Sequence, residues 1–277
     1  MKRRRRLFTA VLVAAALLTV AFLVFPILAV FLRISPVELA GQLGNDAAVD
    51  ALLVSLKTSA IAHAIVLLVG TPAAYLLASR RFPGRAAVLT LIELPLVLPP
   101  AVAGIGLLAA FGRLGLLGGT LDALGISVSF TQVAVVLAVL LVASPFYLRA
   151  AVAAFESVDQ GLLEASRTLG AGPARTFARV ALPLAAAGLG AGSTLAFARG
   201  LGEFGATIMF AGSLQGRTQT LPLAIYAQLV RDFDVALSVG ALLVLVSLAV
   251  LLFAKLVPSW TAYASISPIR FARSTSS

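Results

Sequence analysis

The chain contains no cysteine and only one histidine among its 277 residues. The absence of cysteine excludes a disulfide framework, a thiolate nucleophile and a zinc site built on thiolates. Charge is also scarce: 12% of the residues are charged, whereas a soluble domain carries about 25%. So few charges cannot cover the surface of a soluble protein of this length, of which 60% is hydrophobic. The composition therefore predicts an all-α integral membrane protein whose apolar surface faces lipid.

Acidic residues are few beside the basic ones, with 11 Asp and Glu against 21 Lys and Arg. Strongly basic chains often bind nucleic acid. Here the cations form short clusters beside apolar runs, which is how the signals that set membrane topology are arranged. We therefore expect membrane lipid, and no nucleic acid, as a partner.

Six stretches are long and apolar enough to cross about 30 Å of hydrocarbon. They are Leu7–Leu32, Leu52–Ala78, Ala86–Phe111, Thr131–Ala153, Ala181–Met209 and Leu237–Val257. The first follows a basic start and imitates a signal peptide, but it exceeds the roughly 7–15 apolar residues of a signal sequence. We interpret it as an uncleaved helix, and the six spans predict a single transmembrane domain over residues 1–277.

The distribution of Lys and Arg predicts the orientation of these spans. The segments predicted to be cytoplasmic hold most of the basic residues, namely Lys2, Arg3, Arg4, Arg5, Arg6, Arg80, Arg81, Arg85, Arg149, Arg167, Arg175, Arg179, Lys255, Arg270 and Arg273. The outer segments hold Arg33, Lys57, Arg113, Arg217 and Arg231, together with six acidic residues. Both termini are therefore expected in the cytoplasm.

The predicted cytoplasmic segment 154–180 contains a short helix. Five residues give it a mildly apolar face at helical spacing: Leu162, Leu163, Ala165, Ser166 and Leu169. Gly170 and the pair Gly172-Pro173 then end the helix. Such a helix suits docking into a groove on another protein or lying on the membrane surface, and its spacing alone favours neither.

This segment also resembles a known pattern. Glu164-Ala165-Ser166, then Gly170, then Val180 and Leu182-Pro183 are spaced as in the EAA loop of binding-protein-dependent ABC importer permeases. Ser166 and Val180 replace the family's Ala and Ile. The resemblance implies the type I permease fold, with this loop as the coupling helix that docks on an ATPase. The chain has no phosphate-binding loop of its own, so ATP and Mg would be used by that separate subunit.

Further segments resemble the molybdate group within that family. They are Leu94–Pro100, Phe111–Gly118, Ala198–Gly212 and Thr220–Tyr226. The resemblance implies a bacterial plasma-membrane permease that works as a homodimer with two ATPase subunits and an external molybdate-binding protein, and that binds no cofactor itself. Sulfate permeases share part of this pattern, so a sulfate or thiosulfate importer stays open, and tungstate is a possible cargo.

Two charged residues in the fifth span, Arg199 and Glu203, are four residues apart and would share one helical face. They form either a translocation gate past which an oxyanion moves, or a mutual ion pair that fixes helix packing. Pro99, Pro100 and Gly104 would open the third span to the same path, or allow close helix contact.

Other signals carry less weight. Glu93, inside the third span, is expected to pair with a basic group. The pattern Gly-x-Gly-x-x-Gly at residues 200–205 lies inside an apolar span, so it does not predict dinucleotide binding. His63, also within a span, is expected to be a packed residue. A polytopic membrane enzyme is the alternative from another class, but a single histidine and no aspartate deep in a span argue against it.

Overall fold

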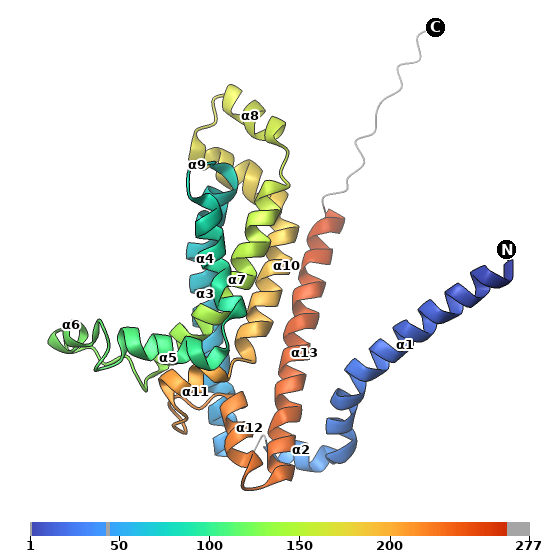
Figure 1. Ribbon diagram of the computed structural model, residues 1–277, viewed down its shortest axis with the longest axis vertical. Coiled ribbons are helices and arrows are strands. Elements are labelled where there is room, and N and C mark those ends of the chain that lie inside the picture. The colour runs from blue at the N-terminus through green and yellow to red at the C-terminus, as the bar shows by residue number, and fades with distance from the viewer. Residues whose placement is uncertain (1, 43–44, 265–277) are drawn as a thin grey trace. The chain divides into compact units, whose positions relative to one another are not determined.

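The computed structural model describes residues 2–42 and 45–264, and its regular elements there are helices (Figure 1). The first half comprises α1 (Lys2–Arg33), α2 (Pro36–Gln42), α3 (Asp46–Ser79), α4 (Arg85–Val97), α5 (Pro100–Phe111), α6 (Gly118–Ala123) and α7 (Gln132–Glu156). The second half comprises α8 (Gln160–Thr168), α9 (Pro173–Thr176), the π-helical turn η1 (Phe177–Ala181), α10 (Leu182–Leu201), α11 (Gly205–Ala211), α12 (Leu221–Leu229) and α13 (Phe233–Ala264).

The described residues contain five helices that are long and apolar enough to span a membrane, or six if the bent pair α4 and α5 counts as one span. The five are Arg4–Arg33, Asp46–Ser79, Gln132–Glu156, Pro173–Leu201 and Phe233–Phe253. The prediction of an all-α protein with about six spans is therefore confirmed. The third span differs from the continuous helix that we expected, because α4 and α5 meet at a bend of 114°.

Consecutive prolines explain this break. Proline has no N–H to donate, so Pro99 and Pro100 leave the carbonyl groups of Pro95 and Leu96 without their helical partners. Leu98, between the two helices, has an extended backbone with φ −68° and ψ 134°. The carbonyl of Pro99 then accepts the N–H groups of Val102 and Ala103 and begins α5.

The fifth span lies earlier in the chain than predicted. The expected range was Ala181–Met209, but the helical segment runs from Pro173 to Leu201, and residues 202–204 leave the helix. The prediction followed the apolar run and was wrong at both ends. The helical segment begins earlier and includes Arg175 and Arg179, while the apolar stretch after Gly202 forms the separate helix α11.

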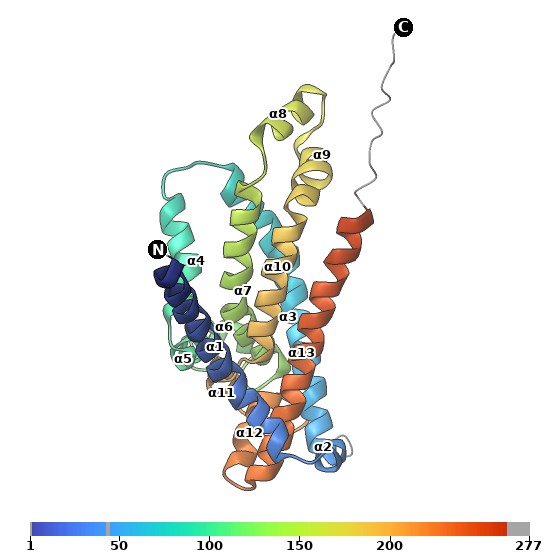
Figure 2. The ribbon, with the colours of Figure 1, turned by 90° about the vertical axis from the view of Figure 1, so that its right-hand side faces the viewer.

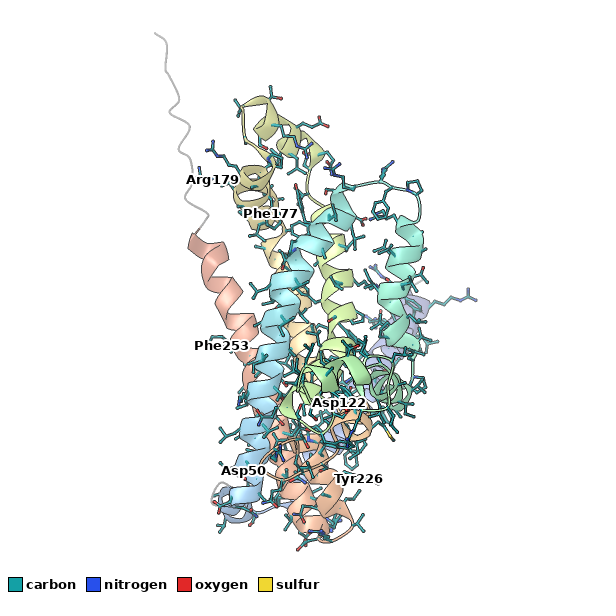
Figure 3. All side chains as sticks on the ribbon, turned by 90° about the vertical axis from the view of Figure 1, so that its left-hand side faces the viewer. Asp50, Asp122, Phe177, Arg179, Tyr226 and Phe253 are labelled. Atoms are coloured by element: carbon teal, nitrogen blue, oxygen red, sulfur yellow. The ribbon has the colours of Figure 1, made fainter. Side chains whose placement is uncertain are left out.

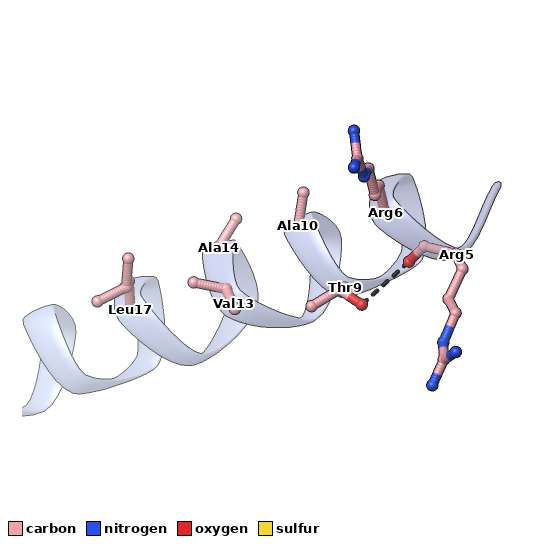
Figure 4. A pocket seen from close by; sticks show the side chains of 7 residues that line it. All are labelled: Arg5, Arg6, Thr9, Ala10, Val13, Ala14 and Leu17. Carbon is pink, nitrogen blue, oxygen red and sulfur yellow. Dashed lines mark hydrogen bonds between the residues drawn. The ribbon is translucent and has the colours of Figure 1, made fainter. Parts of the chain in front are cut away.

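The helix α1 is exposed along its apolar window in the described chain. Figure 4 shows its first turns, where the hydroxyl of Thr9 donates to the carbonyl of Arg5 at 3.0 Å. All residues lining the shallow hollow in this view come from α1 itself. The hollow is therefore a groove between side chains of a single helix and not a binding site.

The chain folds into two compact units. Among the described residues, one contains 59–103, 136–201 and 247–264, and the other contains 2–42, 45–58, 104–135 and 202–246. In the first unit, Tyr147 is buried against Gly70 and its hydroxyl lies 2.6 Å from that of Thr71. In the same unit, His63 lies 2.8 Å from the Ser193 hydroxyl, which links α3 to α10.

The second unit is held by an apolar cluster and by one hydrogen bond from a side chain to the backbone. Leu221, Val239 and Leu242 are buried together with small residues of α3. The Ser55 hydroxyl accepts the N–H of Leu221 at 2.7 Å. That N–H belongs to the first turn of α12 and has no partner within the helix, so Ser55 satisfies it inside the protein.

Glycines bring α7 and α10 into close contact within the first unit. A Cβ atom at Gly188 would lie 2.6 Å from the Cβ of Ala154, and one at Gly192 would lie 2.6 Å from the Cβ of Ala150. Small residues allow helix backbones in a membrane to approach in this way. Gly190, between them, has open space around it. Gly188 and Gly192 therefore serve close helix packing.

This contact gives a direct test of the α7–α10 packing. Gly192→Ala should destabilise the protein by about 1–3 kcal/mol, because the added methyl group overpacks the contact with Ala150. Gly190→Ala is the matched control, and it should be neutral or slightly stabilising because alanine favours helix. Thermal unfolding of both variants in detergent measures the difference. Equal midpoints for the two variants would contradict the packing.

Candidate functional site

The short helix α8 lies beyond the ends of α7 and α10 in their unit (Figures 1 and 2). Asp159 begins it, and the Asp159 carboxylate accepts the N–H of Gly161 at 2.8 Å. This N-cap satisfies one of the backbone donors that a helix start leaves open. The helix predicted within residues 154–180 is therefore present.

Gly170 ends α8 in a left-handed conformation, with φ +84°. The N–H of Gly170 donates to the carbonyl of Arg167, and the N–H of Ala171 donates to the carbonyl of Ser166. These two bonds form the Schellman motif, in which glycine is favoured because it has no Cβ. A Cβ at Gly170 would meet no atom within 4 Å, so the backbone conformation, and not crowding, requires glycine here.

Two contacts fix α8 to the segment that follows it. Leu163 is buried in the apolar core of the unit, at 3% exposure. The hydroxyl of Ser166 lies 3.0 Å from the hydroxyl of Thr176, which is itself buried. Ser166 is one of the two departures from the family pattern, and the structure explains it, because this serine links α8 to α9.

The predicted apolar face of α8 divides into two groups. Leu163 and Ser166 face the protein, whereas Leu162, Ala165 and Leu169 are exposed. Glu164 is also exposed. The outer surface of α8 therefore combines apolar side chains with one carboxylate on a helix that is anchored from below, as a docking surface for another protein requires.

A continuous helical segment leads from α9 to α10. The ring of Phe177, labelled with Arg179 in Figure 3, lies 4.8 Å from that of Tyr75, which lies 5.3 Å from that of Phe155. The π-helical turn η1 precedes Leu182 and Pro183. Because Pro183 lacks an N–H, the normal helical bond to the carbonyl of Arg179 cannot form, and a π-helical turn is one way in which a helix accommodates such a defect.

Arginines gather at this end of the unit. They are Arg80 and Arg81 between α3 and α4, Arg85 at the start of α4, and Arg167, Arg175 and Arg179. Arg85 forms an ion pair with Glu156 and donates from Nε to the carbonyl of Leu77 at 2.6 Å. By the positive-inside rule, we expect this end in the cytoplasm.

Arg199, in the last turn of α10, lines a small cavity beside the break between α4 and α5. The cavity has a volume of about 100 Å³ and is lined by Pro95, Leu96, Leu98, Pro100, Val142, Phe146 and Arg199. Two of the sequence-predicted gate residues, Arg199 and Pro100, therefore lie at one place. A guanidinium has five N–H donors, so it suits a site where prolines leave carbonyl groups open.

Glu203 does not share a helical face with Arg199, and that premise is wrong. The helix α10 ends at Leu201, and the Glu203 carboxylate accepts the N–H of Ala206 at 2.8 Å. Glu203 is only 2% exposed. It therefore stabilises the start of α11, where a negative charge also interacts favourably with the helix dipole.

Gly104 lies in α5 against α11. A Cβ atom at Gly104 would lie 2.6 Å from the carbonyl oxygen of Ala206 and 2.8 Å from the Cβ of Met209. The structure thus gives Gly104 a packing role, the second of the two alternatives for this residue. The two short helices α5 and α11 contact each other at this glycine.

Glu93 has a basic partner, as expected, and the partner is Arg149 of α7. The Nε of Arg149 lies 3.8 Å from the Glu93 carboxylate, and the two side chains are 71% and 47% exposed. The sequence did not indicate this pairing, because Arg149 was assigned to orientation alone.

An outer loop contains a second, larger cavity that the sequence did not indicate. It has a volume of about 560 Å³ and lies between the end of α5, α6 and residues 126–130. Arg113 and Asp122, which is labelled in Figure 3, form an ion pair of 3.5 Å at this loop. In the described residues, no group of three or more His, Cys, Asp or Glu residues is placed to hold a metal ion.

Comparison with known proteins agrees with this geometry. The chain is 44% identical over 237 residues to the molybdenum transport system permease protein ModB of Mycobacterium tuberculosis, covering 86% of this chain and 90% of the relative. It is 42% identical over 214 residues to the protein of that name from Escherichia coli K12, covering 77% of this chain and 93% of the relative. A probable transport system permease protein, NifC of Clostridium pasteurianum, is 37% identical over 235 residues, covering 84% and 82%.

Solved structures share the fold. A bacterial ABC transporter involved in the import of alginate aligns with a TM-score of 0.73 at 17% identity, over 91% of this chain and 95% of that chain. The MetNI methionine ABC transporter aligns with a TM-score of 0.58 at 21% identity, over 76% and 93%.

A family model for the inner membrane component of binding-protein-dependent transport systems matches residues 68–262. The match includes α8, the segment from α9 to α10, and the break between α4 and α5. The chain therefore belongs to the family of binding-protein-dependent transport system inner membrane components.

Proposed function

We propose that this chain is the permease subunit of an ATP-driven importer that carries molybdate, or the similar oxyanion tungstate, into the cell. The observation that carries the transport role is α8, an anchored helix that presents Leu162, Leu169 and Glu164 at the cytoplasmic end. The substrate is proposed from the relatives, which are named molybdenum transport permeases and match most of the chain.

The helix α8 suits a mechanical role because it is held at three points. Leu163 is buried beneath it, Ser166 contacts Thr176, and the Schellman motif at Gly170 joins it tightly to the next segment. ATP binding to a partner can favour one arrangement of the spans only through contacts that differ between two arrangements. A rigid docking helix transmits such a bias into α10 through Leu182 and Pro183.

The partners follow from this role. Two copies of the chain would enclose one path, two cytoplasmic ATPase subunits would dock on the α8 helices, and an external molybdate-binding protein would deliver the anion. ATP and Mg would be bound by the ATPase subunits. This chain itself would bind no cofactor.

We assign the gate to the cavity that contains Arg199 and Pro100. The planar fork of arginine donates two parallel hydrogen bonds and so suits a tetrahedral oxyanion. Pro99 contributes by ending α4, and Gly104 by allowing α5 to pack on α11. Glu203, by contrast, stabilises the start of α11.

The substrate proposal is tested by uptake in membrane vesicles that contain the complete importer. Labelled molybdate should be taken up in an ATP-dependent manner, and unlabelled tungstate should compete at low excess while sulfate should not. Competition by sulfate at low excess, or uptake of sulfate itself, would instead support the sulfate or thiosulfate importer.

The coupling role predicts a specific effect of Gly170→Ala. The left-handed backbone at this residue costs alanine about 1–2 kcal/mol, which should loosen the end of α8 and lower ATPase-driven uptake. Gly172→Ala is the matched control, because Gly172 has φ −67° and open space around it. Uptake and ATPase activity, measured together, should be uncoupled in the first variant and normal in the second. Normal coupling in Gly170→Ala would refute the role.

The gate assignment predicts different results for two neighbouring residues. Arg199→Ala should reduce oxyanion uptake while the complex still assembles. Glu203→Ala should instead lower the stability of the permease by about 1–2 kcal/mol, because the start of α11 loses its cap. Complex yield, thermal unfolding and uptake separate the two effects. If Arg199→Ala mainly prevents assembly, Arg199 serves packing and the gate assignment fails.

A further inference from the structure

Two ion pairs join α4 to α7, and they differ in kind. The pair of Arg85 with Glu156 lies at the helix ends, where Arg85 is 26% exposed and also donates to the carbonyl of Leu77. The pair of Glu93 with Arg149 has a separation of 3.8 Å, and Arg149 is 71% exposed. Hydrogen bonds between such groups have lengths of about 2.7–2.9 Å. The first pair therefore fixes the two helices together, whereas the second is a loose contact.

The loose pair lies within the spans. Arg149 precedes the end of α7 by seven residues, and Glu93 follows the start of α4 by eight. At 1.5 Å per residue, these positions are about 10–12 Å from the Arg85–Glu156 pair along the helices. Ionisable groups at such depth are costly against lipid and normally face a protein interior or water. The surface of α4 and α7 that carries Glu93 and Arg149 is therefore not a lipid-facing surface.

The loose pair also adjoins the cavity of Arg199. Pro95 and Leu96, which line the cavity, follow Glu93 by less than one helical turn. Phe146, which also lines the cavity, precedes Arg149 by three residues and so occupies the same side of α7. Arg199 of α10 thus lies at the break between α4 and α5. Arg149 of α7 follows it in the direction of the end that carries α8.

We propose that Arg149 is a second oxyanion-binding residue of the translocation path, and that the oxyanion engages it by displacing the carboxylate of Glu93. This inference rests on the proposed function and names a further residue of the same path. A dianion attracts a guanidinium about twice as strongly as a carboxylate does at equal distance. The Arg149–Glu93 contact of 3.8 Å is long, so an oxyanion readily replaces the carboxylate. The Arg149 guanidinium then holds the oxyanion through two parallel N–H donors.

The role of Glu93 follows from the same exchange. With no anion present, Glu93 neutralises Arg149 and lowers the cost of keeping a cation inside the span. When the anion leaves toward the cytoplasm, Glu93 contacts Arg149 again and prevents the anion from rebinding. Arg149 thus releases the anion because the Glu93 carboxylate, on the neighbouring helix α4, competes for the same guanidinium.

The experiment uses the complete importer, with its ATPase subunits and binding protein, in phospholipid vesicles, and molybdate is the probe. Arg149→Gln should lower the initial rate of uptake by about tenfold or more, the loss expected for one charge-assisted contact. Binding-protein-stimulated ATPase activity, complex yield and thermal unfolding should stay as in the unmodified protein. Glu93→Gln should lower uptake less than Arg149→Gln does, because the anion still binds but is released more slowly, and the double variant should behave as Arg149→Gln. Arg81→Gln, an exposed arginine between α3 and α4, is the control for lost charge.

A purely architectural pair predicts another pattern. In that case Glu93→Gln and Arg149→Gln would impair uptake equally, the double variant would be no worse than either, and complex yield would fall. That result, or unchanged uptake in Arg149→Gln, would overturn the proposal. If the unmodified importer takes up no molybdate, the proposed function fails first. If the unmodified importer takes up molybdate and Arg149→Gln takes it up at the same rate, only the role of Arg149 fails.

Discussion

The hydrocarbon of a membrane provides no water to satisfy a backbone carbonyl group, so every N–H that the sequence removes must be compensated inside the protein. This chain removes such donors at the break between α4 and α5 and at the start of α10. Pro99 and Pro100 end α4 and turn the chain into α5, beside a cavity that Arg199 lines. Pro183 follows a π-helical turn in the segment that leads from the docking helix into α10. The irregular backbone is therefore located where movement and anion contact are expected.

Regular packing surrounds these irregular places and keeps them in position. Gly188 and Gly192 bring α10 against α7, and the hydroxyl groups of Thr71 and Tyr147 pair between α3 and α7. Beneath the docking helix, Leu163 and the rings of Tyr75, Phe155 and Phe177 form a continuous apolar support. A helix of nine residues would not be stable alone. These contacts, and not its intrinsic propensity, make α8 a defined surface.

The sequence was sufficient for the features that depend on composition and local spacing. The number of spans follows from the apolar runs, and the short helix α8 with its terminal Gly170 follows from helical spacing and a glycine at its end. The sequence was not sufficient where two distant segments meet. The pairing of Glu93 with Arg149 joins residues 56 positions apart, and no local pattern indicates it. Hydropathy also failed at Glu203, because an apolar stretch does not reveal that a carboxylate starts a new helix there.

The position of Arg85 has a mechanical consequence. Its guanidinium contacts both Glu156, the last residue of α7 before the docking segment, and the carbonyl of Leu77 near the end of α3. The beginning of α4 is thereby tied to the ends of two neighbours. A pull exerted on the loop at α8 reaches α4 through this single side chain, by a shorter route than the one through α9 and α10. The start of the broken third span is thus attached to both α3 and α7 by one side chain.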